Sequence, residues 1–222
     1  MATRAKATLA YLNGRGLGES VRMILAAAGI EFSEILVTKK EQLDKLRADG
    51  DLFFMQIPML EIDGMKLVQS GTIIRYIAST YGLDGKTPED KTRVDMLYEG
   101  ARDFLLKFLR VGFIPDKDPH VEKIKTKTLP RYRPIFEKVL TESASGYLVG
   151  DGLTRADLAL LEALLSAEEY VPGSLDGFPN LQEFKDRVSS VPRIKAFLEG
   201  PQRKPTATPE FVAECKEVFG LF

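Results

Sequence analysis

This chain has little of what several common kinds of site require. Among its 222 residues are one cysteine, one histidine and no tryptophan. The single cysteine, Cys215, excludes an intrachain disulfide and fits a reducing compartment. One cysteine and one histidine also leave no metal-ligand spacing and no Ser/His/Asp or Cys/His pairing. We therefore expect chemistry carried by tyrosine, arginine, backbone amides or a cofactor's own reactive group.

Charge and hydrophobicity exclude further classes. A formal net charge of −1 at pH 7 gives no general attraction to nucleic acid or to an anionic membrane. The basic run at 123–127 is interrupted at every second residue, as is typical of a solvated helix surface. No stretch approaches the roughly 18 apolar residues of a membrane helix, and the amino terminus lacks the apolar region of a signal peptide. We expect a cytoplasmic protein with no nucleic-acid partner and no stable membrane insertion.

The lone histidine, His120, lies in the polar, proline-containing segment 115–120 between two helical patterns. Such composition is typical of a loop. We interpret His120 as a loop residue without a catalytic role.

The organisation of the chain changes near residue 82. Before it, strand-like and helix-like segments alternate, and after it only helical periodicity is found. The first part predicts strands at 7–12 and 32–37, helices at 19–28, 41–48 and 70–81, and a hairpin of two strands around Asp63-Gly64. This order is the thioredoxin-like arrangement, but the CxxC motif of a redox enzyme is absent.

We therefore expect two domains. The first spans residues 1–82, a linker occupies 83–88, and an all-α domain spans 89–222. In the second domain we expect long helices at 89–113 and 121–140, the latter broken or kinked at its prolines.

Three further helices are expected. Thr154 and Asp157 have the spacing of a capping box, whose role we interpret as structural. A short helix is expected at 191–198. Thr208 precedes Pro209 as the N-cap of a terminal amphipathic helix. That helix either completes the core or acts as a mobile lid over an apolar pocket.

Tyr11 ends the first apolar run, immediately before the glycine-rich turn Asn13-Gly14-Arg15-Gly16 and a helix. Strand-to-helix junctions of α/β folds lie outside the carboxyl ends of strands, where ligands bind. A phenol there can donate a hydrogen bond to an anion, although most tyrosines only pack through the ring.

Two other segments carry possible binding groups. A cis Ile57-Pro58 bond would present the backbone of Ile57 to an extended peptide ligand, although cis bonds are a minority of about 5–6%. Gln69-Ser70 opens a helix, so the free amides and the hydroxyl form a carboxylate site, or Ser70 is an ordinary N-cap.

Together these motifs resemble the cytosolic glutathione transferases over nearly the whole chain. The segments that carry the resemblance are the turn at 11–16, Gln56-Ile57-Pro58, Glu61-Ile62-Asp63-Gly64, Gln69-Ser70 and Thr154-Arg155-Ala156-Asp157. Stretches at 26–29, 59–69, 136–140 and 147–150, with the terminal helix, are most similar to the alpha class. The resemblance implies an α/β thioredoxin-like N-terminal domain, and an all-α C-terminal domain with a hydrophobic pocket and a lid helix.

The resemblance also implies the chemistry. Tyr11 would be the catalytic residue, donating to the sulfur of glutathione, which is a co-substrate, with no metal. A free thiol with a pKa of about 8.5 is only a few per cent ionised at neutral pH, so stabilising the thiolate increases the nucleophile directly. The product would be a conjugate of glutathione with a hydrophobic electrophile.

Further site residues follow from the same resemblance. The glutathione-binding positions would be Arg15, Arg47, Gln56, Ile57, Pro58, Gln69, Ser70, Asp103 and Arg131. Arg47 would pair with the glycyl carboxylate and Ile57 with the cysteinyl unit. Gln69 and Ser70 would hold the γ-glutamyl carboxylate, and Arg15 would be mostly structural. The electrophile pocket would be formed by Leu12, Leu17, Leu106, Leu109, Phe113, Val212, Cys215 and Phe219.

A homodimer is implied as well. Asp103 and Arg131 would reach the γ-glutamyl group from the partner subunit, and Phe54 would insert into the neighbouring helical domain. Burying one phenylalanine stabilises an interface by roughly 1.5–3 kcal/mol.

The chain departs from the alpha class at three positions. Leu17 stands where an arginine adds positive charge next to the sulfur, which predicts altered activity more than lost activity. Met23 replaces a tryptophan. Ser70 stands where threonine is usual, and it retains the hydroxyl.

Two other functions stay open. The chain could be a weakly active carrier of hydrophobic ligands or a structural protein, or a glutathione-dependent isomerase of ketosteroids or prostaglandins.

Overall fold

The computed structural model describes residues 7–114, 116–205 and 207–220. Contacts between residues divide the chain into two compact units. The first unit contains Met1–Ile77 together with Ala196–Phe222, and the second contains Ala78–Lys195. The contacts of the terminal segment therefore group it with the first unit, although in the sequence this segment follows the second unit. The functional domain boundaries expected at 82 and 89 stay a prediction.

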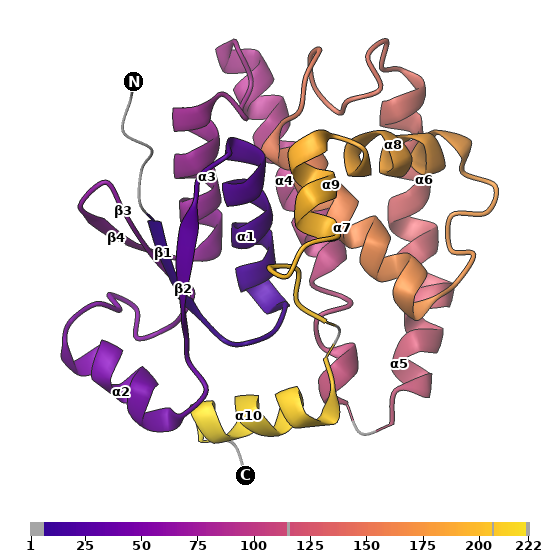
Figure 1. Cartoon of the computed structure of the whole chain (residues 1–222). Coiled ribbons are helices and arrows are strands. Elements are labelled where there is room, and N and C mark those ends of the chain that lie inside the picture. The colour runs from indigo at the N-terminus through magenta and orange to yellow at the C-terminus, as the bar shows by residue number, and fades with distance from the viewer. Residues whose placement is uncertain (1–6, 115, 206, 221–222) are drawn as a thin grey trace. The chain divides into compact units, whose positions relative to one another are not determined.

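The first unit is built on a four-stranded sheet (Figure 1). The strands are β1 (Ala7–Tyr11), β2 (Phe32–Leu36), β3 (Met59–Ile62) and β4 (Met65–Val68), in the order β2-β1-β3-β4. β1 is parallel to β2 and antiparallel to β3, and β3 is antiparallel to β4. Asp63 and Gly64 both have positive φ, 51° and 76°, as a tight hairpin turn requires. The predicted thioredoxin-like arrangement is confirmed.

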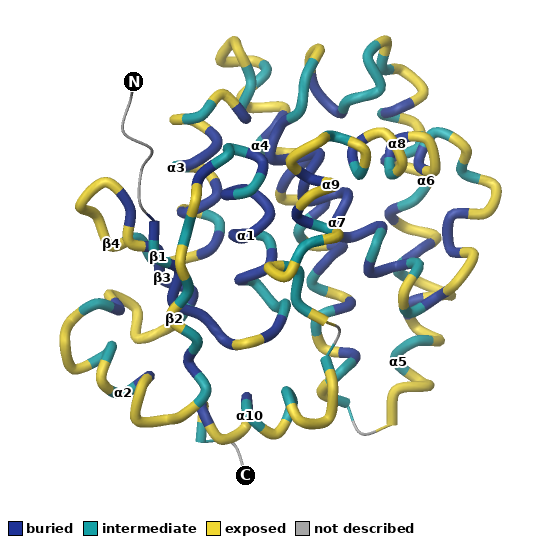
Figure 2. The backbone as a smooth tube through the Cα atoms, in the orientation of Figure 1, coloured by how far each residue is buried: buried dark blue, intermediate teal, exposed yellow. Residues whose placement is uncertain are grey.

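Helices accompany the sheet. They are α1 (Gly16–Ala28), α2 (Lys40–Ala48), α3 (Ser70–Tyr81) and the terminal α10 (Pro209–Phe219), with α9 (Pro192–Leu198) leading into the terminal segment. α1 begins three residues earlier than predicted. Apolar residues of β1, α1 and α3 form the core, in which Leu9, Val21 and Ile73 are fully buried (Figure 2). This core holds β1 in place and so positions Tyr11, its last residue.

The second unit is helical, as predicted, but its first long helix is shorter than expected. α4 (Pro88–Leu105) is followed by turns and the short 3₁₀ helix η1 (Val111–Phe113). The expected helix at 89–113 was therefore wrong beyond residue 105. Gly112 and Pro115 in the sequence disfavour continued helix, and the backbone changes to i→i−3 hydrogen bonds at Lys107.

The next helix was predicted to break or kink at Pro130 and Pro134, but its irregular turn lies before both prolines. α5 (Asp118–Lys123) passes through the π-helical turn η2 (Ile124–Thr128) into α6 (Leu129–Thr141). Pro130 lies in the first turn of α6, where its missing N–H is tolerated, and Pro134 lies inside the helix. His120 lies in α5, so the expected loop was wrong.

The remaining helices are α7 (Arg155–Tyr170) and α8 (Pro179–Ser189), and α8 was not predicted. α4 packs against α7. The capping box is confirmed, because Asp157 Oδ2 accepts from the backbone N–H of Thr154 at 2.8 Å. Asp157 Oδ1 accepts from Leu148 N–H at 2.8 Å. Burial raises the pKa of Asp157 to about 6, and these hydrogen bonds oppose the shift.

Candidate functional site

The candidate site is centred on Tyr11, the last residue of β1. Its side chain is 7% exposed, and its hydroxyl oxygen accepts a hydrogen bond from the backbone N–H of Leu17 at 3.0 Å. A Cβ added at Gly18 would lie 2.1 Å from Tyr11 Cδ1, and one at Gly16 would lie 2.4 Å from the hydroxyl oxygen. The glycines of the turn therefore allow α1 to start directly against the phenol.

The surroundings of Tyr11 keep it protonated. Burial raises the pKa of Tyr11 above its ordinary value, and Cys215 contributes in the same direction. The hydrogen bonds from the backbone of Leu17 and Gly18, and the charge of Arg22, lower it by less. Because the oxygen accepts from Leu17, the phenolic hydrogen is free to be donated to another group.

Several predicted site residues lie at the same end of the sheet as Tyr11. Leu36 pairs with Tyr11 on one side, and Ala10 pairs with Met59 on the other. Extending the registers of β1, β3 and β4 by one residue places Pro58 beside Tyr11 and Gln69 beside Pro58. Two strand spacings separate Tyr11 from Gln69 by about 10 Å. Three extended residues span about the same distance, so a tripeptide can lie along this edge.

The loop before β3 contains a cis peptide bond, Ile57-Pro58, which is the isomer that would present the backbone of Ile57 to an extended ligand. Pro58 is buried, Ile57 is half-buried and Gln56 is exposed. Arg47 reaches this loop from α2, since its Nε donates to the Met55 carbonyl oxygen at 3.1 Å.

Arg47 is also held at its other end. Its Nη1 lies 3.0 Å from Asp44 Oδ1, one turn earlier on α2. Two fixed contacts leave the guanidinium half-buried beside the loop, where its remaining donors can bind a carboxylate.

Gln69 and Ser70 form the start of α3. Gln69 is exposed and has a positive φ of 69°, whereas Ser70 is 5% exposed. The first amides of a helix lack intrahelical partners and attract anions. A Cβ added at Gly71 would meet nothing within 4 Å, so the helix start is open. The sequence predicted a carboxylate site here, or an ordinary N-cap at Ser70, and the binding role stays a prediction.

The terminal helix α10 supplies a further part of the site. Cys215 is 4% exposed and acts electrostatically on Tyr11, and burial raises the pKa of the Cys215 thiol to about 12. Val212 is half-buried and Phe219 is 42% exposed. Leu12, on the turn, is 5% exposed. These residues all belong to the first unit.

Sequence reasoning missed two features here. A Cβ added at Gly14 would lie 2.2 Å from the ring of Phe211. The Phe211 ring, on α10, therefore packs directly against the glycine-rich turn. Arg22 and Glu19 are both fully buried and lie 2.9 Å apart. Two opposite charges three residues apart on an otherwise apolar helix face were a signal that could have revealed this buried ion pair.

The other predicted site residues lie in the second unit. Leu106 and Leu109 are half-buried, and Phe113 is 41% exposed. Asp103 and Arg131 are exposed, with Arg131 Cζ 5.2 Å from the Tyr132 ring centroid. Their roles stay predictions.

In residues 7–114, 116–205 and 207–220, no group of three His, Cys, Asp or Glu side chains can hold a metal ion. His120 Nε2 lies 3.0 Å from the Lys107 carbonyl oxygen. None of the described helices is both long enough and apolar enough to cross a membrane.

Comparisons with known proteins agree with this geometry. A family model described as "Glutathione S-transferase, N-terminal domain" matches residues 7–79, and one described as "Glutathione S-transferase, C-terminal domain" matches residues 102–201. Among curated proteins, the chain is 46% identical to Glutathione S-transferase A3 of Mus musculus, with 96% of this chain and 98% of the relative covered. It is 45% identical to Glutathione S-transferase alpha-5 of Rattus norvegicus, at the same coverage.

A solved structure gives the same result. The crystal structure of monomeric Na-GST-3, a glutathione S-transferase from the hookworm Necator americanus, matches with a TM-score of 0.80 and 34% sequence identity. The match covers 93% of this chain and all of that chain.

Proposed function

Because the chain belongs to the glutathione S-transferase family, we propose that it is a transferase that conjugates the thiolate of glutathione to hydrophobic electrophiles. The observation that carries this proposal is the hydroxyl of Tyr11, which accepts from Leu17 N–H and keeps its own hydrogen free. The alpha-class names of similar curated proteins support the assignment to that class.

Tyr11 would lower the energy of the glutathione thiolate. Burial holds the pKa of Tyr11 above its ordinary value, so the phenol is a neutral donor at physiological pH. Hydrogen bonds to charged groups contribute about 1.5–3 kcal/mol. This corresponds to lowering the pKa of the thiol by about 1–2 units, which is roughly a 10- to 150-fold gain in its acid dissociation constant. The thiolate sulfur would then form a bond to the electrophilic carbon. In a substitution, the leaving group, such as a halide, departs with the electron pair of the bond that breaks. In an addition, the electron pair moves onto the electrophile, which then takes up a proton from water.

Glutathione would lie along the sheet edge. The cysteinyl unit would pair with the backbone of Ile57, and the γ-glutamyl carboxylate would bind at Gln69 and Ser70. Arg47 would hold the glycyl carboxylate, since it is fixed beside the loop by Asp44. Gln56 and Pro58 would complete the set, with Arg15 in a mostly structural role.

The electrophile would contact a set of apolar residues. The set proposed is Leu12, Leu17, Leu106, Leu109, Phe113, Val212, Cys215 and Phe219. Support comes from the first unit, where Cys215 lies close enough to Tyr11 to affect it electrostatically. Leu17 carries no charge, so the activation of the thiolate would depend on Tyr11 more than in relatives with arginine there.

We also propose a cytoplasmic homodimer, in which Asp103 and Arg131 complete the partner's glutathione site. Phe54 is 55% exposed and Phe53 is 82% exposed, so two aromatic rings of the first unit are available to an interface. Because a similar protein is titled monomeric, the oligomeric state needs its own test. Phe54→Ala is expected to shift the 24.7 kDa chain from dimer to monomer in sedimentation, at concentrations where wild type is dimeric. A wild-type monomer at all concentrations would contradict the proposal.

The catalytic proposal is tested with a generic aromatic halide and glutathione. Tyr11→Phe is expected to lower kcat/KM about 10- to 150-fold, because the variant lacks only the donated hydrogen bond. Tyr147→Phe, in a loop of the second unit, is the matched control and should keep wild-type rates. Equal rates for Tyr11→Phe and wild type would refute the role of the phenol. Tight binding of apolar dyes without conjugation would favour a carrier, and turnover without glutathione consumption would favour an isomerase.

A further inference from the structure

The segment between α9 and α10 carries two cations that lie against carboxylates of the first unit. Arg203 Nη1 lies 3.1 Å from Glu19 Oε1, and Lys204 Nζ lies 3.1 Å from Glu34 Oε2. The backbone N–H of Lys204 donates to the same Glu19 oxygen at 3.2 Å. The side chains of Arg203 and Lys204 are only 11% and 12% exposed, and Glu19 is fully buried. Salt therefore screens these pairs weakly.

Both carboxylates also bind Arg22. Its Nη1 lies 2.9 Å from Glu19 Oε2, and its Nε lies 2.7 Å from Glu34 Oε1. The guanidinium also donates to the carbonyl oxygens of Gly14 at 2.8 Å and Leu12 at 3.0 Å. Because the guanidinium is a rigid fork of donors, a shift of either carboxylate is transmitted to the glycine-rich turn.

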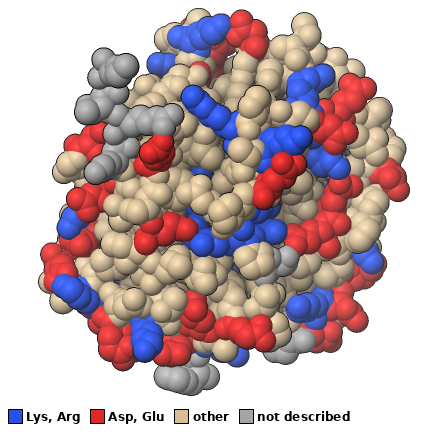
Figure 3. Space-filling model, viewed as in Figure 1, with Lys and Arg blue, Asp and Glu red and all other residues tan. Residues whose placement is uncertain are grey.

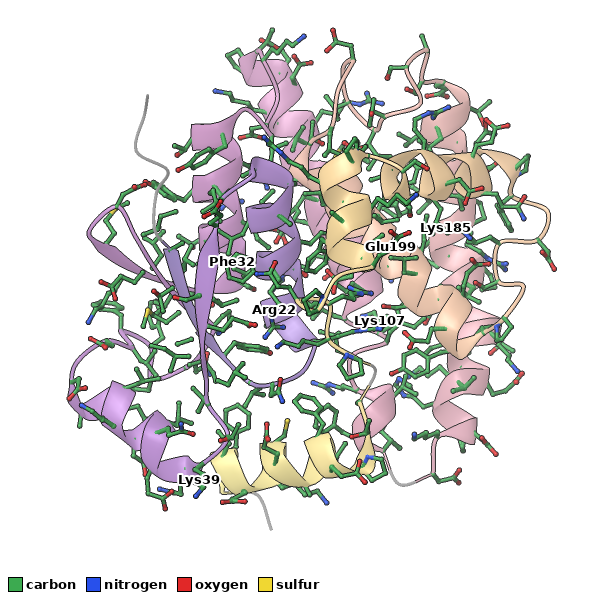
Figure 4. All side chains as sticks on the ribbon, in the orientation of Figure 1. Arg22, Phe32, Lys39, Lys107, Lys185 and Glu199 are labelled. Atoms are coloured by element: carbon green, nitrogen blue, oxygen red, sulfur yellow. The ribbon has the colours of Figure 1, made fainter. Side chains whose placement is uncertain are left out.

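These five charged side chains form one cluster, here called the tail network: Glu19, Arg22, Glu34, Arg203 and Lys204. Figure 4 shows Arg22 among the side chains between α1 and the segment that leads into α10. The formal charge of the tail network is +1, from three cations and two carboxylates. On the face visible in Figure 3, Lys and Arg side chains lie among Asp and Glu side chains over much of the surface. Removing one side chain of the tail network leaves the opposite charge buried without its partner. The effects of single substitutions in the tail network are therefore not additive.

The terminal segment touches the turn at further points. Arg15 Nε donates to the carbonyl oxygen of Lys204 at 2.7 Å. Thr208 caps α10 by accepting from Phe211 N–H at 3.2 Å, and Phe211 contacts Gly14. The same turn is therefore held by the tail network and by the first turn of α10.

We propose that Arg203 and Lys204 are positioning residues for glutathione activation: through Glu19 and Glu34 they fix Arg22, and so couple the attachment of α10 to the placement of Tyr11. The coupling is short, because Arg22 Cζ lies 5.8 Å from the centroid of the Tyr11 ring. The inference rests on the proposed function, in which Tyr11 donates to the glutathione sulfur. It assigns a part in catalysis to residues that lie almost two hundred positions later in the chain.

The test uses the full-length protein with Lys204→Met, Glu34→Gln and the double variant. The ultraviolet absorbance of the thiolate is titrated with glutathione bound, and kcat and KM are measured with an aromatic halide. Lys204→Met should raise the apparent pKa of the bound thiol by about half a unit, which is about threefold less thiolate. kcat/KM should fall by at least about threefold, with KM for glutathione changed less than about twofold. Lys216→Met, an exposed position on α10, is the control.

Three further results decide the proposal. The double variant should lose no more than the stronger single variant, and Lys204→Arg should restore the thiol pKa. Amide hydrogens of α10 should exchange faster in Lys204→Met than in Lys216→Met. A thiol pKa in both Lys204→Met and Glu34→Gln equal to that of the control would overturn the inference.

Tyr11→Phe separates this failure from that of the proposed function. If Tyr11→Phe raises the thiol pKa and Lys204→Met does not, only the inference fails. If Tyr11→Phe has no effect, the proposed role of the phenol fails first. Should Lys204→Met fold poorly, Glu34→Gln carries the same comparison.

Discussion

Gly18 provides a sharp test of how closely α1 must approach Tyr11. A Cβ at this position would lie 2.1 Å from Tyr11 Cδ1 and 2.6 Å from Cγ, whereas ordinary van der Waals contact begins at 3.4 Å. Gly18→Ala therefore requires the ring or the helix to move by about 1.3 Å. A displacement of about 1 Å at a reacting group can cost 100-fold in rate. We expect kcat/KM of Gly18→Ala to fall by 10-fold to about 100-fold.

Stability changes less than activity, because two effects oppose each other. Replacing glycine by alanine inside a helix gains about 1 kcal/mol, and overpacking costs about 1–3 kcal/mol. The net destabilisation is therefore about 0–2 kcal/mol, and the variant should remain folded.

Gly100 provides the matched control. It lies inside α4, where an added Cβ would contact only Phe136 Cζ at an ordinary 3.8 Å. Gly100→Ala should be stabilised by up to about 1 kcal/mol in urea unfolding and keep wild-type activity. If Gly18→Ala gains the same stability as Gly100→Ala and retains full conjugation activity, the close packing of the phenol against α1 is not what positions it.

Two other predictions follow from buried groups. Because burial raises the pKa of Asp157 to about 6, the stability it contributes is fully present below about pH 4 and is lost as pH rises through about 6. In urea unfolding, the free energy of unfolding of wild type should fall by up to about 3 kcal/mol relative to that of Asp157→Asn over this pH range. The control Asp186→Asn, at an exposed position, should show the same pH dependence as wild type. If the stability of wild type and of Asp157→Asn changes in parallel with pH, the prediction is contradicted. The thiol of Cys215, with its pKa raised to about 12 by burial, should react with a disulfide reagent about 1,000-fold slower in the native protein than in denaturant. Rapid labelling of the native protein would show that α10 does not bury it.

Much of the first unit could be predicted from local sequence. The alternation at 59–68 with Asp63-Gly64 at its centre specifies a hairpin because few residues accept the positive φ of that turn. The amphipathic spacing of Ser70–Tyr81 specifies α3 because one helix face must be buried. Element ends were less predictable. α4 stops at Leu105 since the chain turns there, while periodicity alone continued to Phe113.

The candidate site divides in the same way. Tyr11, Gln69 and Ser70 could be picked out as candidate site residues because ligands often bind at strand ends and anions at helix starts. The strand registers, extended by one residue, then bring Tyr11 and Gln69 to the same sheet edge. The distances from Tyr11 to its neighbours were not accessible from sequence, because they depend on how α1 packs.

The sequence by itself determined the order of strands and helices in the first unit and its hairpin, since these follow from short-range conformational preference and turn chemistry. It also offered Tyr11 as the candidate phenol, through the family resemblance. Only the tertiary structure decided that Arg203 and Lys204 lie against Glu19 and Glu34, and that Phe211 rests on Gly14. Such contacts join residues 170 to 197 positions apart. The conformational preferences of neighbouring residues do not specify these contacts. The charge pairs form because a charged group that is buried on folding is stable only next to an opposite charge.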